Sequence, residues 1–229
     1  MDKWDDFFKK WSDDMAYALG FICADGAVEG SPPRYVSLYS TDVVLLRQLK
    51  KRIGFPHPVR PVRRTQQNVR WKIAYRVQIG SVAWVRDLEK LGVVANKSFS
   101  IQLPKIPKKF FASFVRGYFD GDGCISFGRY KRSENNAYRW TITSRFSSGS
   151  KDFLLALLSA LRATGAVQSG FIYQKNRSFD LVFSWRDSAG LYALMYKKRD
   201  GETLFLPRKL KIFQKASKIF RQFDSTLRA

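Results

Sequence analysis

The spacing of apolar residues predicts the same order of elements in both halves of the chain. In each half an apolar helix is followed by a short strand, and then by a second strand near residues 35–40 or 138–146. Amphipathic helices come next at residues 42–53 and 152–163, each opened by an aspartate that suits a helix N-terminus. Their apolar faces are formed by Val44, Leu45, Leu49 and Ile53, and by Phe153, Leu154, Leu157, Leu158 and Leu161.

A second hairpin and a further helix complete each half. The hairpins are predicted at residues 59–64 with 69–79 and at 167–174 with 179–185, and the helices near residues 83–91 and 188–198. A last amphipathic helix is expected near residues 207–223, and Pro104 and Pro107 mark the join between the halves. We therefore expect an α+β fold of two αββαββα repeats, residues 1–108 and 109–229, in one compact body.

Two strands alternate between polar and apolar side chains, as half-buried strands do. Such polar faces can hydrogen-bond base edges and phosphates in a DNA major groove, although an ordinary solvated face is the alternative for any single residue. The polar faces carry Arg70, Lys72, Arg76 and Gln78, and Arg139, Thr141, Thr143 and Arg145, whereas the apolar faces carry Trp71, Ile73, Tyr75, Val77 and Ile79, and Trp140, Ile142, Ser144 and Phe146. Basic and amide residues also gather at the hairpin tips: Arg63, Arg64, Gln66, Gln67, Arg129, Lys131, Arg132, Lys175 and Arg177.

The net charge of +22 over 229 residues is shared by both halves of the chain. A folded chain this positive is expected to bind a polyanion, and nucleic acid is the leading candidate. A basic membrane-surface protein is the alternative, but no polybasic segment, basic amphipathic helix or membrane-spanning apolar run stands out. With two cysteines and one histidine, the composition argues against zinc sites and histidine-based catalysis, and for a reducing, intracellular location.

One segment occurs twice, as ALGFICADG at residues 18–26 and as VRGYFDGDG at residues 115–123. Glycine in a helix interior is disfavoured by about 1 kcal/mol, so its presence in both copies needs a reason. Close pairing of the two helices along a stripe of small residues supplies one, because positions four apart share one helix face. The stripe consists of Ala16, Gly20 and Ala24 in the first copy, and of Ser113, Gly117 and Gly121 in the second.

Pairing would place Asp25 and Asp122 together at helix C-termini, where two carboxylates repel each other and the helix dipole. A divalent cation resolves that conflict, hard oxygen ligands favour Mg²⁺, and such ions promote phosphodiester hydrolysis. The alternative is that each Asp-Gly pair is a turn and each glycine a helix cap. Because the small-residue stripe and the terminal aspartate recur in the same register in both copies, the metal site is favoured over the turn.

The two segments resemble the LAGLIDADG motif, and the chain resembles a single-chain LAGLIDADG homing endonuclease over essentially its whole length. The match is partial: the first copy keeps Gly20, Ile22, Ala24, Asp25 and Gly26, and the second keeps Gly117, Asp120, Asp122 and Gly123. The resemblance implies a central pair of motif helices and saddle-shaped antiparallel sheets that lie along double-stranded DNA. It further implies an intron-associated monomer that cuts both strands of a long, asymmetric site.

Residue roles follow from the same resemblance. Asp25 and Asp122 become the catalytic pair, with the backbone carbonyls of Ala24 and Gly121 as further metal ligands. Mg²⁺ is the expected cofactor, with Mn²⁺ substituting and Ca²⁺ supporting binding without cleavage. A basic residue near the scissile phosphate is expected in each repeat, and the positional candidates are Lys97 and Lys209, for which a solvated surface lysine is the alternative. Cys23 replaces one motif acid and is expected to be a small core residue, not a reactive thiol.

Other functions on the same fold stay open at this point. A non-cleaving nucleic-acid binder, either an RNA splicing maturase or a DNA-binding regulator, is the main alternative. Retention of Asp25 and Asp122 favours the nuclease, and the lack of a helix-turn-helix appendage disfavours the regulator. A basic structural or ribosomal protein would not explain the paired motifs. The target sequence and the host are not readable from the chain.

Overall fold

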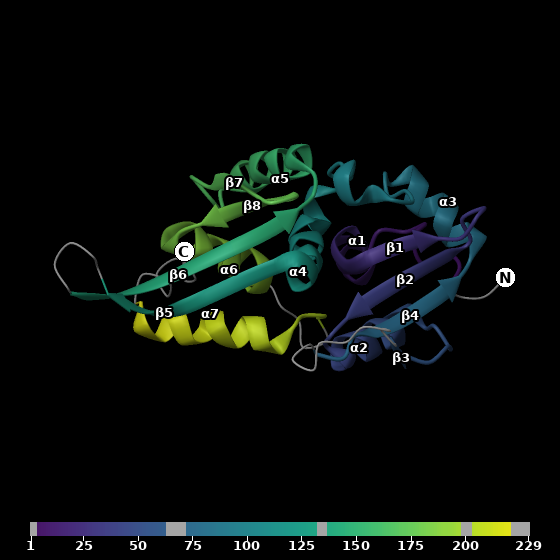
Figure 1. Ribbon diagram of the computed structural model, residues 1–229, viewed down its shortest axis with the longest axis horizontal. Coiled ribbons are helices and arrows are strands. Elements are labelled where there is room, and N and C mark those ends of the chain that lie inside the picture. Colours follow the sequence, from purple (N-terminus) through teal and green to yellow (C-terminus); the bar gives the residue numbers. More distant parts are fainter. Residues whose placement is uncertain (1–3, 63–71, 132–136, 198–202, 221–229) are drawn as a thin grey trace. The chain divides into compact units, whose positions relative to one another are not determined.

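The computed structural model describes residues 4–62, 72–131, 137–197 and 203–220 (Figure 1). The predicted α+β fold is confirmed, because each half follows the order α-β-β-α-β-β-α. The first half contains α1 (Asp13–Asp25), β1 (Gly26–Glu29), β2 (Tyr35–Ser40), α2 (Val43–Ile53), β3 (Arg60–Pro61), β4 (Tyr75–Gly80) and α3 (Val82–Lys90), followed by two 3₁₀ helices, η1 (Lys97–Phe99) and η2 (Lys108–Phe110). The second contains α4 (Phe111–Asp122), β5 (Gly123–Lys131), β6 (Tyr138–Ser148), α5 (Lys151–Ala163), β7 (Phe171–Lys175), β8 (Ser178–Phe183), α6 (Trp185–Tyr196) and a final α7 (Pro207–Ile219).

Each half builds one antiparallel sheet of four strands, in the order β1-β2-β4-β3 or β5-β6-β8-β7. In both sheets the strand that leaves the motif helix pairs with the next strand, so Ala27 lies opposite Ser37 and Cys124 lies opposite Arg145. Helices α1, α2 and α3 pack on the first sheet, while α5 and α6 pack on the second and α7 lies against β5. The side chains of Val36, Leu38, Val77 and Ile79, and of Ile142, Phe146, Leu181 and Phe183, are buried between sheet and helices. The opposite face of each sheet carries the polar positions.

Two of the predicted core positions are wrong. Val44 is 52% exposed, whereas Leu46 is fully buried, so the buried face of α2 is rotated from the one predicted. Ile73 is 53% exposed because the strand that was expected over residues 69–79 begins only at Tyr75. Its hairpin partner β3 is also short, although the Val62 N–H, one residue beyond it, still donates to the carbonyl of Ala74 at 2.8 Å.

Serine residues, more than the predicted aspartates, begin the helices. The Ser150 hydroxyl accepts a hydrogen bond from the backbone N–H of Phe153, so Asp152 lies in the first turn of α5 and is not its cap. Asp42 does occupy the N-cap of α2, but its side chain makes no capping hydrogen bond. An acid in the first turn, such as Asp152, still interacts favourably with the helix dipole, which explains why an aspartate lies near the start of this helix.

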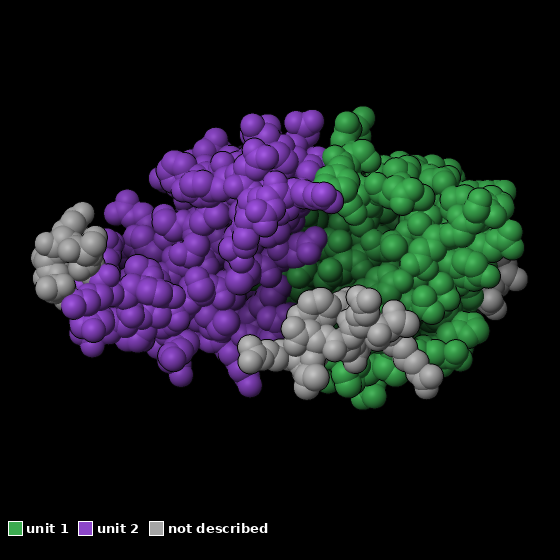
Figure 2. All heavy atoms as spheres, in the orientation of Figure 1, with its two compact units in different colours: residues 1–121 green, residues 122–229 purple. Residues whose placement is uncertain are grey.

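The chain divides into two compact units, residues 1–121 and 122–229 (Figure 2). The boundary expected from the sequence repeat, after residue 108, lies earlier in the chain. The difference arises because nearly all of α4 packs against α1 and therefore belongs to the first unit. Within the described ranges, no helix combines the length and the apolar character that crossing a bilayer requires.

Candidate functional site

Helices α1 and α4 approach each other at backbone contact. A Cβ atom on Gly20 would lie 2.1 Å from the carbonyl oxygen of Phe114, and one on Gly117 would lie 2.0 Å from that of Tyr17. Only glycine fits at these two crossing points, since real Cβ contacts lie well beyond such distances. Ala16 and Ser113, the other expected interface residues, are buried on the same two helices.

Polar contacts also hold this helix pair. The hydroxyl of Tyr17 donates to Oδ2 of Asp120 at 2.6 Å, and both side chains are buried. The guanidinium of Arg116 lies 5.8 Å from the centre of the Tyr17 ring and donates to the hydroxyl of Ser113. The earlier acid of the second motif copy, Asp120, therefore binds α1 to α4, a role that the motif alone did not assign.

The two motif helices end at the candidate metal ligands. Asp25 is the last residue of α1 and Asp122 the last of α4, and both are partly exposed. A Cβ on Gly121 would lie 2.5 Å from the Cβ of Ala24 and 3.5 Å from Oδ2 of Asp25, so glycine keeps the space beside this carboxylate free of a side chain. Carboxylate and backbone carbonyl oxygens are ligands that suit a hard divalent cation. Among the described residues, no group of three or more His, Cys, Asp or Glu side chains could hold a metal by itself.

A buried lysine stands beside each motif end. Nζ of Lys97, from η1, donates to the carbonyl oxygen of Gly26 at 2.7 Å, and Nζ of Lys209, from α7, donates to that of Gly123 at 2.6 Å. Each accepting residue directly follows a motif aspartate. The side chains are only 6% and 2% exposed, so the alternative of a solvated surface lysine is wrong at both positions. Because burying an ammonium group is unfavourable without strong partners, these two lysines are held in place.

Polar side chains on the outer face of the first sheet form a hydrogen-bond network that the alternation of polar and apolar residues did not predict. Arg76 and Gln78 are half-buried there, beside the carboxylate of Glu29 on β1. Glu29 accepts hydrogen bonds from the hydroxyl groups of Ser37 and Tyr39 and from the amide of Gln78. Glu29 was not among the predicted residues; its place two residues after Ala27 on an alternating strand was the available signal.

The second sheet carries a different set of side chains. Arg139, Thr141, Thr143 and Arg145 alternate with more buried residues along β6, as predicted. Nη1 of Arg145 lies 3.4 Å from Oδ2 of Asp180, and Oδ1 of the same carboxylate accepts from the Ser147 hydroxyl at 2.6 Å. Asp180 was missed because a single acid in a basic strand pattern has no distinguishing spacing. The predicted basic residues at the strand ends are exposed, namely Arg129, Lys131, Lys175 and Arg177.

Several residues predicted at the hairpin tips lie outside the described part of the chain. Arg63, Arg64, Gln66, Gln67 and Arg70 lie outside the described residues, as does Arg132 of the second unit. Lys72 is described and exposed, but it precedes β4 and is not part of the strand.

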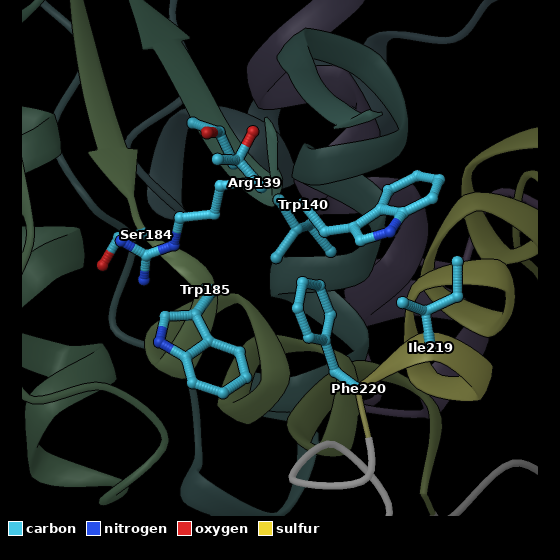
Figure 3. A pocket seen from close by; sticks show the side chains of 9 residues that line it. Arg139, Trp140, Ser184, Trp185, Ile219 and Phe220 are labelled. Carbon is cyan, nitrogen blue, oxygen red and sulfur yellow. The ribbon is translucent and has the colours of Figure 1, made fainter. Parts of the chain in front are cut away.

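A pocket of about 590 Å³ opens in the second unit beside β6 (Figure 3). It borders Arg139, Thr141 and Thr143, in the part of β6 that β8 leaves unpaired. Trp185 and Phe220 form its aromatic wall, with their ring centres 5.0 Å apart. These three predicted DNA-contacting residues therefore edge a cavity and do not lie on a closed sheet surface.

The two thiols are expected to differ sharply in reactivity. Cys23 is 4% exposed, and burial raises the pKa of its thiol to about 12, although the positive charge of Lys97 lowers it in part. Cys124 is exposed. We therefore expect an aromatic disulfide reagent to modify one thiol in the native protein and two in denaturant, since the thiolate is the reactive form. Release of two equivalents of the aromatic thiolate per native protein would mean that both cysteines react, and would contradict the core position of Cys23.

The chain is similar to one curated protein over part of its length, whereas no protein-family model matches it. The reverse gyrase of Methanocaldococcus jannaschii is 26% identical over 129 residues, which make up 56% of this chain but only 7% of that protein. The chain thus spans a small fraction of the length of the curated relative that it matches.

Solved structures match nearly the whole chain. The LAGLIDADG meganuclease I-AabMI, bound to uncleaved DNA, is 15% identical with a TM-score of 0.59, covering 91% of each chain. I-SmaMI bound to cleaved DNA is 14% identical with a TM-score of 0.55, covering 95% of this chain and 92% of that one. I-SmaMI bound to uncleaved DNA in the presence of calcium ions is 13% identical with a TM-score of 0.51, covering 96% and 97%. The chain therefore has the LAGLIDADG meganuclease fold, as its two motif copies predicted.

Proposed function

We propose that the protein is a site-specific endonuclease that cuts both strands of a long, asymmetric DNA site with divalent metal held by Asp25 and Asp122. The observation that carries this proposal is the duplicated motif end, in which a carboxylate is followed by a carbonyl that binds a buried lysine. A nucleic-acid binder without catalysis has no need of an ammonium group buried twice in the same register. The relatives of the same fold, described as bound to uncleaved and to cleaved DNA, support the same function.

Each residue type has a defined part in the proposed reaction. The carboxylates of Asp25 and Asp122 bind the metal, and the carbonyls of Ala24 and Gly121 lie next to them in the chain. A bound Mg²⁺ supplies an activated water and stabilises charge on the phosphate. Lys97 and Lys209 place a fixed positive charge one residue beyond each aspartate, where it can stabilise the developing charge of the scissile phosphate.

The sheets supply the proposed DNA contacts. The net charge of +22 provides the non-specific attraction to phosphate, and the outward strand faces provide side chains that can read base edges. The first face presents Gln78 beside Glu29, whereas the second presents Arg145 beside Asp180. Because the two faces differ chemically, we expect the two half-sites to differ in sequence.

A selection on a randomised duplex library tests the function. Enrichment of one long site that is cut with Mg²⁺ or Mn²⁺ and only bound with Ca²⁺ is the expected result. Binding of a preferred duplex without cleavage under every divalent cation would support the second candidate, a non-cleaving maturase or regulator. Competition with single-stranded and structured RNA in the same assay separates those two.

The lysines are expected to matter for the cleavage step more than for binding. Replacing Lys97 or Lys209 by Met keeps most of the buried side-chain volume but removes the charge, and we expect cleavage to slow about a hundredfold. Dissociation constants measured with Ca²⁺ should change by less than about threefold, since each ammonium is buried. Lys90→Met, at an exposed lysine on α3, is the matched control. Equal losses of binding and cleavage would assign the lysines a purely structural part.

A further inference from the structure

Among the described residues, the outer face of the first sheet carries one carboxylate, that of Glu29, in a surface otherwise suited to DNA phosphates. The donors to Glu29 come from the next two strands of the sheet: the hydroxyls of Ser37 and Tyr39 on β2, each at 2.7 Å, and Nε2 of Gln78 on β4, at 3.1 Å. An acid on a DNA-facing surface repels phosphate, so its presence needs a reason other than backbone binding.

The carboxylate of Glu29 is ionised at neutral pH. Burial by itself raises the pKa of Glu29, but the hydrogen bonds from Tyr39, Ser37 and Gln78 and the charge of Arg76 lower the pKa overall. An ionised carboxylate only accepts hydrogen bonds. The amide nitrogen of Gln78 must therefore face Glu29, and the amide cannot flip without setting its own oxygen against a negative charge.

The oxygen of the Gln78 amide is thereby turned away from Glu29. The side chain is half-buried on the outer face, and among the described residues no donor reaches this oxygen. A glutamine without such a partner can present either end of its amide to a base. Here the nitrogen already bonds Glu29, which leaves the oxygen as the acceptor of this side chain.

Resting on the proposed DNA function, we propose that Gln78 reads one base of the target through its carbonyl oxygen, and that Glu29 is the positioning residue that orients it. Adenine and cytosine carry an exocyclic amine in the major groove, whereas guanine and thymine carry a carbonyl there. Gln78 therefore selects an amino base and rejects a keto base at this position. The second amide hydrogen can add a bond to N7 of adenine, which would favour adenine over cytosine.

The outer face of the second sheet holds a hydrogen-bond donor, where the first sheet holds the acceptor oxygen of Gln78. Arg145 occupies the register position that Ser37 has in the first sheet, opposite the residue two after the motif aspartate. Asp180 holds its guanidinium, and a guanidinium is a donor only. An acid thus fixes an acceptor on one sheet and a donor on the other, which accounts for a carboxylate on each outer face.

The test measures base preference along the selected site. Duplexes that carry each of the four base pairs at every position are assayed for binding with Ca²⁺ and for cleavage with Mg²⁺, using the wild type, Gln78→Leu and Glu29→Gln. For the wild type we expect one base pair at which adenine or cytosine on one strand is preferred roughly tenfold over guanine or thymine on that same strand. Both variants should reduce that preference to less than about twofold at the same position, because Gln at residue 29 lets the Gln78 amide flip. Gln48→Leu, at an exposed residue of α2, is the control and should retain the preference.

The outcomes separate this inference from the proposed function. If the preference that Gln78→Leu removes does not depend on which strand of the base pair carries the amino base, or if Glu29→Gln leaves the preference intact, the inference is wrong while the nuclease stands. Loss of binding to every duplex by the wild type would overturn the DNA function and the inference together. Thermal melting of each variant shows that altered preference does not come from unfolding.

Discussion

Replacing Asp25 by Asn is expected to slow DNA cleavage by about a thousandfold or more, with DNA binding retained. Asparagine keeps the shape of the side chain but loses the charge that holds a divalent cation. The same result is expected for Asp122→Asn, because both aspartates end a motif helix and precede the carbonyl that binds a buried lysine. Single-turnover cleavage with Mg²⁺ and binding with Ca²⁺ measure the two effects separately.

The stability of these variants distinguishes catalysis from structure. Removing a negative charge at a helix C-terminus relieves its repulsion with the helix dipole, by about 0.3–1 kcal/mol. Asp25→Asn should therefore melt no lower than the wild type within about 2 °C. Asp152→Asn, at an exposed aspartate of α5, is the matched control and should cleave normally. An unchanged cleavage rate in Asp25→Asn would show that the metal is held elsewhere.

Replacing Gly117 by Ala is expected to destabilise the protein, although alanine is the better helix former. In an isolated helix the change would be favourable by about 1 kcal/mol. Here the added methyl group would lie 2.0 Å from the carbonyl oxygen of Tyr17, and backbone cannot move aside as a side chain can. The helices must separate, so we expect a net loss of about 3 kcal/mol or more in the free energy of unfolding.

The measurement is a melting curve for Gly117→Ala beside a matched glycine. For a chain of this size the expected loss lowers Tm by roughly 6–12 °C. Gly80→Ala is the control, because its Cβ would meet the Tyr35 ring at 3.4 Å, an ordinary contact. Its Tm should change by less than about 3 °C. A Gly117→Ala protein that melts at or above the wild type would contradict the close pairing of α1 and α4.

Local patterns predicted the elements with few errors. The second strand of the first half was expected at residues 35–40 and lies at Tyr35–Ser40, because period-two alternation depends on neighbouring residues alone. The errors have a common cause: Val44 and Ile73 are apolar residues that the described part of the chain leaves about half exposed. An apolar side chain can be buried, but whether it is buried depends on the segments that pack against it.

The candidate site likewise combines features that the local sequence predicts with features that depend on remote contacts. The repeated aspartates and the small-residue stripe were visible as a pattern, since both copies repeat them in register. The burial of the lysines was not, because their partners are remote: Lys97 binds a carbonyl 71 residues away and Lys209 one 86 residues away. Glu29 was missed for this reason as well, since the amide that it orients lies 49 residues along the chain.

The sequence by itself determined the α+β order of elements, the duplication, the basic charge and the two aspartates at the ends of apolar helices. These properties are local or additive, so they can be read without knowing which segments meet. Only the tertiary structure decided that Gly20 and Gly117 lie against backbone, that two lysines are buried beside the motif ends, and that Glu29 turns the amide of Gln78. Each of these depends on contacts between distant segments, and distance along the chain carries no information about them until the chain has folded.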